Sequence, residues 1–192
     1  MPKPNVREKL LAAGLECLHE HGFNATGVQD ITEAAGVPKG SFYNHFASKE
    51  ALGVEAVRRY VELNTQRMQI LADASIAPLA RLRAYFESLA ETIEQLGYQR
   101  GCLLGNFGTE LASQSQLIRE STAAGLAGWT DAIALVIREA QAAGAVPAHF
   151  APQALAGFII NAWEGAIVRA RVDQSRDALD GFLSLTFAKI LA

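Results

Sequence analysis

Hydrophobic residues recur along this chain at intervals of three and four positions, the spacing that places them on one face of an α-helix. No segment shows the two-residue alternation of Val, Ile and Thr with polar residues that predicts a β-strand. The pattern therefore predicts an all-α protein.

The first part of the chain predicts several short helices with clear breaks between them. They are expected over residues 6–21, 27–36 and 38–46, and again after Ser48. Gly22 ends the first helix, and Thr26 is expected to cap the second. Pro38 is tolerated in the first turn of the third helix, where its missing N–H is not needed.

Longer amphipathic helices are expected in the remainder of the chain, over residues 79–96, 102–113, 115–143, 155–170 and 179–190. The segment AGAVPAHFAP, with two prolines, separates the last two helices from those before them. This pattern predicts a three-helix head over residues 1–47 and a larger helical body over residues 48–192. The helix after Ser48 continues from the head into the body.

The stretch GVPKGSFYNHF, residues 36–46, predicts the second half of a helix-turn-helix. Gly36 supplies a left-handed turn, and Phe42 and Phe46, four positions apart, can pack into the core. The remaining side chains point outward, none is acidic, and Gly40 allows close approach of a partner: Lys39, Ser41, Tyr43, Asn44 and His45. Such a face fits a DNA major groove. The alternative is a solvated polar face on a small helix.

The segment TGVQDITEAAGVPKGSFYNHFASKEAL, residues 26–52, resembles the DNA-binding head of the TetR (tetracycline repressor) family in its pattern AGV.KG..Y.HF followed by SKE.L. The resemblance implies a dimeric repressor that binds palindromic double-stranded operator DNA and releases it when a small molecule binds the helical body. It implies base contact by Lys39 and phosphate contacts by Tyr43, His45, Lys49 and Thr26. The implied DNA-binding set is Thr26, Lys39, Gly40, Ser41, Tyr43, Asn44, His45 and Lys49.

A second segment, RGCLLGNFGTEL over residues 100–111, is similar to one in a subgroup that includes the N-ethylmaleimide reductase repressor and acrylate-responsive regulators. The similarity implies an electrophile or a small unsaturated acid as inducer. Cys102 is expected at a helix N-terminus near Arg100, a setting that favours a reactive thiolate. The alternative is that Cys102 is a small buried hydrophobic residue. Cys17 lies on the core stripe of the first helix and is expected to be structural.

Polar and aromatic residues within the apolar helices of the body are candidates for lining a ligand pocket. With Cys102 they form the predicted sensor set: Tyr85, Asn106, Trp129, Asn161, Trp163 and Glu164. Small residues among the apolar positions of residues 155–170 predict a homodimer interface formed with the last helix, the alternative being a core within one chain.

Composition narrows the function further. The chain has 192 residues, a net charge of −3 and two cysteines far apart in sequence, which favours a reducing cytoplasm, with the protein at the nucleoid when bound to DNA. No catalytic cluster, cofactor motif, metal-ligand spacing or membrane-spanning run is found, so no enzyme, cofactor, metal or membrane partner is expected. The alternative function is a helical binding or scaffold protein without DNA-binding activity.

Overall fold

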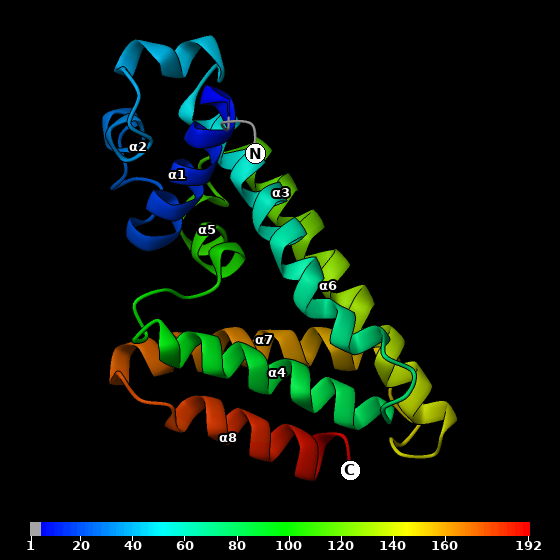
Figure 1. Ribbon diagram of the computed structural model, residues 1–192. Helices are drawn as coiled ribbons and strands as arrows, with labels where there is room; N and C mark the ends of the chain where they lie inside the picture. The colour runs from blue at the N-terminus through cyan, green and yellow to red at the C-terminus, as the bar shows by residue number, and fades with distance from the viewer. Residues whose placement is uncertain (1–4) are drawn as a thin grey trace. The chain divides into compact units, whose positions relative to one another are not determined.

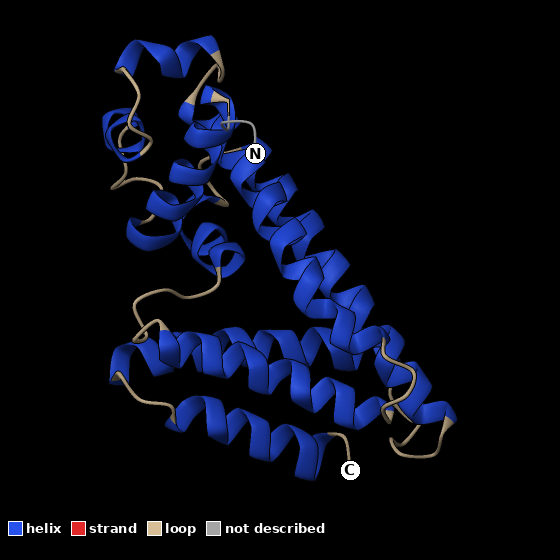
Figure 2. Cartoon of the chain, viewed as in Figure 1, coloured by secondary structure: helices blue, strands red, loops and turns tan. Residues whose placement is uncertain are grey.

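The computed structural model describes residues 5–192, so residues 1–4 of the predicted head lie outside the described part. Every regular element in residues 5–192 is helical, which confirms the all-α prediction (Figure 2). The contacts divide the chain into two compact units. One contains the residues up to Leu63 together with Cys102–Gly125, and the other contains Asn64–Gly101 together with Leu126–Ala192.

The first unit is built around the close packing of its first and fourth helical elements. Its elements are α1 (Val6–His21), α2 (Val28–Ala34), the 3₁₀ helix η1 (Lys39–Asn44), most of α3 (Lys49–Met68), α5 (Leu103–Leu111) and the beginning of α6 (Gln116–Ala142) (Figure 1). A Cβ added to Gly14 on α1 would lie 2.6 Å from the side chain of Leu52 on α3. Glycine at this position therefore lets the two helices approach closely.

Ion pairs reinforce the contact between α1 and α3. The Arg7 guanidinium donates to Glu55 at 2.5 and 2.6 Å, and Arg59 donates to Glu8 at 2.9 Å. Because these side chains are partly exposed, we expect each pair to add only about 0–1 kcal/mol to stability. The two pairs mainly select the alignment of the helices.

The second unit has an aromatic core. Its elements are η2 (Gln69–Ala72), α4 (Pro78–Gln95), the rest of α6, α7 (Pro152–Asp173), α8 (Asp177–Leu185) and a π-helical turn, η3 (Thr186–Ile190). The rings of Phe86, Trp163 and Phe182 have pairwise centroid distances of 5.1–5.3 Å. Helices α4, α7 and α8 meet at this cluster, so its burial holds them together.

A buried arginine connects further elements of the second unit. Arg81 on α4 is 3% exposed, donates to the carbonyl of Leu71 in η2 at 2.8 Å and forms an ion pair with Glu139 on α6. A charge removed from water needs such partners. Arg81 therefore fixes the position of η2 relative to α4 and α6.

Most of the predicted helices are confirmed, and two details of the head are corrected. α1 spans the predicted residues 6–21, and α4 to α8 agree with prediction to within a few residues. The element expected over residues 38–46 is shorter, a 3₁₀ helix over 39–44, as is common for pieces of this length. The expected cap of α2 was wrong. Gly27 caps α2, and its N–H donates to Asp30 at 2.6 Å.

The segment after Cys102 packs with the head. A Cβ on Gly125 in α6 would lie 3.2 Å from Leu104 in α5, and one on Gly53 in α3 would lie 3.2 Å from Ile118 in α6. The compact units therefore do not coincide with the division at residue 47, which stays a prediction about where DNA and ligand bind. Of the helices in residues 5–192, none combines the length and the apolar character needed to cross a membrane.

Candidate functional site

The helix-turn-helix consists of α2, a turn over residues 35–38 and η1. At the turn, Gly36 has a φ of +64°, the left-handed conformation that favours glycine. Its N–H donates to the carbonyl of Glu33 at 3.0 Å, and the N–H of Val37 donates to that of Thr32 at 3.0 Å. These bonds satisfy the end of α2 and redirect the chain into η1.

Two buried rings fix the orientation of η1. Phe42 is fully buried and Phe46 is 3% exposed, with their ring centroids 5.7 Å apart. The guanidinium carbon of Arg7 lies 5.0 Å from the centroid of the Phe46 ring. Because Phe42 points into the core, its neighbours on η1 point away from it.

The outward face of η1 is polar and free of acidic residues. Lys39, Gly40, Tyr43, Asn44 and His45 are exposed, Tyr43 by 62%, whereas Ser41 is half-buried. A Cβ added to Gly40 would meet no atom within 4 Å, so packing within the chain does not require glycine there. The face therefore presents hydrogen-bond donors and an uncovered backbone to a partner.

Thr26 and Lys49 are placed differently from the rest of the expected DNA-binding set. Thr26 is 1% exposed, and its hydroxyl donates to the carbonyls of Gly22 at 2.7 Å and Cys17 at 3.3 Å. The Lys49 ammonium donates to the carbonyls of Phe23 and Thr26 at 2.8 and 2.7 Å. Burial lowers the pKa of Lys49, which Glu110 and Asp30 partly offset. Both side chains bind the turn before α2 in this structure, and the phosphate contacts expected of them stay a prediction.

Cys102 lies at the predicted place, directly before the first residue of α5. It forms no disulfide and is 7% exposed, and the N–H of Asn106 donates to its carbonyl at 2.9 Å. Reactive cysteines are typically partly exposed, and buried ones are inert. In this structure little of Cys102 is therefore accessible to a reagent.

Of the other predicted sensor residues, Asn106 is half-buried on α5 in the first unit, and the rest lie in the second unit in unlike surroundings. Tyr85 and Trp163 are buried by 98 and 99%, Trp163 within the aromatic core. Trp129 is 7% exposed, and its buried indole nitrogen has no hydrogen-bond acceptor. Asn161 is exposed on α7 and Glu164 is half-buried. Among the predicted sensor residues, Trp129 thus offers a buried donor that a ligand could satisfy.

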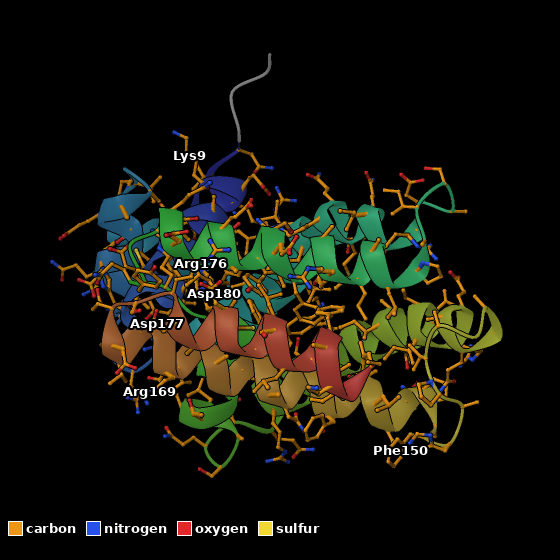
Figure 3. The ribbon with its side chains drawn as sticks, turned by 90° about the horizontal axis from the view of Figure 1, so that it is seen from below. Lys9, Phe150, Arg169, Arg176, Asp177 and Asp180 are labelled. Atoms are coloured by element: carbon orange, nitrogen blue, oxygen red, sulfur yellow. The ribbon has the colours of Figure 1, made fainter. Side chains whose placement is uncertain are left out.

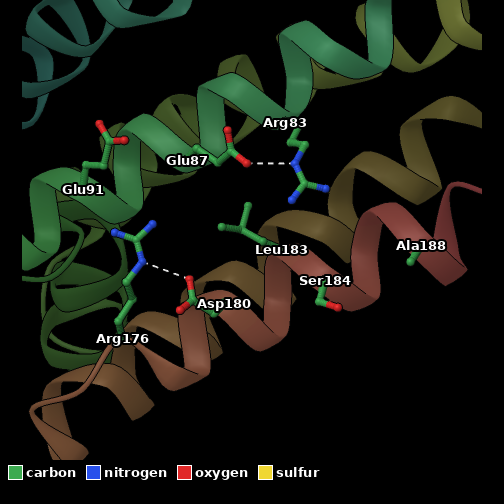
Figure 4. Close-up of a pocket in the computed structure, with 8 residues that line it drawn as sticks. All are labelled: Arg83, Glu87, Glu91, Arg176, Asp180, Leu183, Ser184 and Ala188. Atoms are coloured by element: carbon green, nitrogen blue, oxygen red, sulfur yellow. Dashed lines mark hydrogen bonds and ion pairs between the residues drawn. The ribbon is translucent and has the colours of Figure 1, made fainter.

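A charged groove between α4 and α8 was not expected from the sequence. It encloses about 330 Å³, and its lining includes two ion pairs, Arg83 with Glu87 at 2.8 Å and Arg176 with Asp180 at 2.9 Å (Figure 4). Arg176 also pairs with Glu94 at 2.6 Å, and these bonds raise its pKa. Arg176 lies directly before α8 and Asp180 on it, both at the surface (Figure 3). The i, i+4 spacing of both pairs was the signal that could have predicted them.

Comparison with known proteins identifies the family. A model of bacterial regulatory proteins of the tetR family matches residues 10–56, which include the whole helix-turn-helix. A model of the tetracyclin repressor-like C-terminal domain matches residues 78–185, more than half of the chain. The chain belongs to the TetR family. The resemblance seen in residues 26–52 is confirmed.

Similarity to individual TetR-family proteins extends over nearly the whole chain. The HTH-type transcriptional repressor DhaR of Mycobacterium sp. (strain GP1) is 38% identical over 100% of this chain and 95% of its own. The repressor NemR of Escherichia coli K12 is 28% identical over 94% and 91%. The crystal structure of regulatory protein TetR from Rhodobacter sphaeroides, 38% identical, superimposes with a TM-score of 0.90 over 97% of this chain and 99% of that one.

Membership of the TetR family decides between the function classes left open by the sequence. Members are DNA-binding transcriptional regulators, so the expectation that this chain is not an enzyme is confirmed. Its relatives are named repressors, which favours the ligand-responsive repressor over the scaffold protein without DNA binding. The exposed face of η1 lies inside the matched DNA-binding segment.

Proposed function

We propose that this protein is a homodimeric repressor that binds a palindromic double-stranded operator and releases it when a small molecule or an electrophile acts on its helical body. The exposed, acid-free face of η1 above two buried rings supports this most directly. One such face spans only a few base pairs, so useful affinity requires two faces on a two-fold axis.

Six residues of η1 and its end form the proposed DNA contact. Lys39 reads a base edge, preferably O6 or N7 of guanine, because its ammonium is a strong donor at the start of the exposed face. Tyr43 and His45 donate to phosphates, and Ser41 and Asn44 contact bases or backbone. Gly40 lets the DNA backbone approach. Thr26 and Lys49 support the head from inside.

The proposed dimer forms through α7 and α8. α7 exposes a stripe at intervals of three and four residues: Ala154, Phe158, Asn161, Gly165, Val168 and Val172. Phe158, Val168 and Val172 are 54, 58 and 74% exposed, and Leu185 on α8 is 61% exposed. Apolar stripes of this kind mark interaction surfaces, and a second copy of the same helices can cover this one.

The proposed inducer acts on the helical body. The likeness of residues 100–111 to the electrophile-responsive subgroup, and the similarity to NemR over most of the chain, favour an electrophile or a small unsaturated acid. Two modes follow from the positions of the predicted residues. An inducer reacts with Cys102, or it binds reversibly near Trp129, whose indole nitrogen has no acceptor.

The decisive test is selection of a binding site from random double-stranded DNA by the purified full chain. We expect a palindromic consensus bound by two chains per duplex, as measured by sequencing and analytical ultracentrifugation. Recovery of no consensus, or of binding with no sequence preference, would reject the function. We expect the protein in the cytoplasm, and at the nucleoid when it is bound to DNA.

A further inference from the structure

The turn between α1 and α2, residues 22–26, is held by two side chains of opposite charge. Glu110 on α5 accepts hydrogen bonds from the N–H groups of Phe23 and Asn24, at 2.9 and 2.6 Å. Lys49, the first residue of α3, donates to the carbonyls of Phe23 and Thr26. One carboxylate and one ammonium thus satisfy the donors and the acceptors of the same turn, and such charge-assisted bonds are stronger than neutral ones.

The side chain of Phe23 ties this turn to the same two helices. Its ring meets that of Phe107 on α5 edge to face, with centroids 6.0 Å apart. The Lys49 ammonium lies 4.2 Å from the Phe23 ring centroid. A Cβ on Gly53 of α3 would lie 3.1 Å from this ring, so the glycine leaves room for it. Figure 1 shows α5 beside α1.

The turn leads directly into the DNA-binding elements. Gly27 caps α2 immediately after Thr26, and α2 packs against both α1 and η1. A displacement of the turn therefore moves α2 and, through the bonds at residues 36 and 37, the start of η1. Glu110, which binds the turn, lies near the opposite end of α5 from Cys102, about 12 Å along the helix at the rise of an α-helix.

We propose that Glu110 is a positioning residue for DNA binding: its carboxylate holds the turn of residues 22–26, and hence η1, in the DNA-binding position as long as α5 stays in place. This deepens the proposed function, on which it rests. An inducer that shifts α5 breaks both bonds from Phe23 and Asn24, and the head loses the geometry that fits DNA. The coupling exists because the inducer-bound and DNA-bound states place Glu110 differently.

The test compares Glu110→Ala with the matched control Glu120→Ala. The Glu120 carboxylate accepts from Gln116 on its own helix, α6. Amide hydrogen exchange reports the contact without DNA. We expect the exchange rates at Phe23 and Asn24 to rise about tenfold or more in Glu110→Ala. The free energy of a hydrogen bond to a charged group corresponds to about that factor in the opening equilibrium. Affinity for the duplex selected by the wild-type chain should fall about tenfold or more. The control should match the wild type in both.

A milder variant grades the effect. Glu110→Gln keeps one acceptor oxygen, so exchange, affinity and the unfolding midpoint should all lie between those of the wild type and Glu110→Ala. Wild-type affinity in Glu110→Ala, or lower affinity with unchanged exchange at Phe23 and Asn24, would overturn the proposal alone. If the wild-type chain selects no duplex, both the proposed function and the role of Glu110 are rejected, regardless of the hydrogen exchange at Phe23 and Asn24.

Discussion

Phe42 and Phe46 lie with their ring centroids 5.7 Å apart beneath η1, whereas Tyr43 between them is 62% exposed. Since Phe42 is fully buried, Phe42→Ala should lower the free energy of unfolding by about 3–5 kcal/mol. Urea denaturation followed by circular dichroism measures this. Tyr43→Ala, the matched loss of an exposed ring, should change stability by only about 0.5 kcal/mol. Equal losses in the two variants would mean that Phe42 is not the core residue of the head.

Lys39→Ala should weaken operator binding by about 1–3 kcal/mol per half-site and relax the preference at one base position, because the ammonium is placed to read a base edge. Fluorescence anisotropy with the selected duplex and its single-base variants measures both effects. The control is Lys189→Ala, an exposed lysine at the end of the second unit, which should bind like the wild type. An affinity loss that is uniform across sequences would assign Lys39 to a phosphate.

Val168→Glu should convert the dimer to a monomer and abolish operator binding with it. Val168 is 58% exposed on the apolar stripe of α7, and a dimer would bury the new carboxylate without a partner at a cost of several kcal/mol. Sedimentation velocity measures the change. Leu135→Glu alters a residue of similar exposure, 52%, on α6 and should stay dimeric. If only the Leu135 variant becomes monomeric, the interface is elsewhere.

The local pattern predicted the helices well because each has its own start and stop signals. Asn5 accepts from the N–H of Glu8 at the start of α1, and Gly22 ends it with a φ of +84°. The cap of α2 was misplaced because the Thr26 hydroxyl donates to carbonyls earlier in the chain, a tertiary contact that outweighs its capping preference.

The contacts that position the site are separated by long stretches of sequence. Glu110 accepts from the N–H of Phe23, 87 residues earlier, and Lys49 donates to the carbonyl of the same residue. No local sequence pattern predicts either contact. The outward residues of η1 were predictable, because Phe42 and Phe46 at helical spacing determine which neighbours point away. The Trp163 side chain was predicted as a ligand candidate but lies within the aromatic core, which only packing reveals.

Cys17 should react slowly with iodoacetamide at neutral pH. Burial, and then the charges of Asp30, Glu20 and Glu16, raise the pKa of its thiol above the usual 9.0. The folded chain therefore binds this proton more tightly than the unfolded chain, so the stabilisation is complete below pH 9.0 and is lost as the pH rises through the folded pKa. Alkylation rates measured from pH 7 to 10 in Cys102→Ser, with free cysteine as reference, test this. A titration midpoint at or below that of free cysteine would contradict it.

The thiol-switch mode predicts different behaviour for the two cysteines. Cys102 is 7% exposed at the start of α5, so an adduct there needs space that the closed state lacks and must favour a state in which α5 has moved. Cys102→Ser keeps the size of the side chain and removes the nucleophile. It should bind the selected duplex like the wild type but retain it when a maleimide is added, whereas wild type and Cys17→Ser should release it. Anisotropy measures release, and mass spectrometry locates the adduct. Release by Cys102→Ser at the wild-type dose would reject the switch and favour a reversible ligand near Trp129.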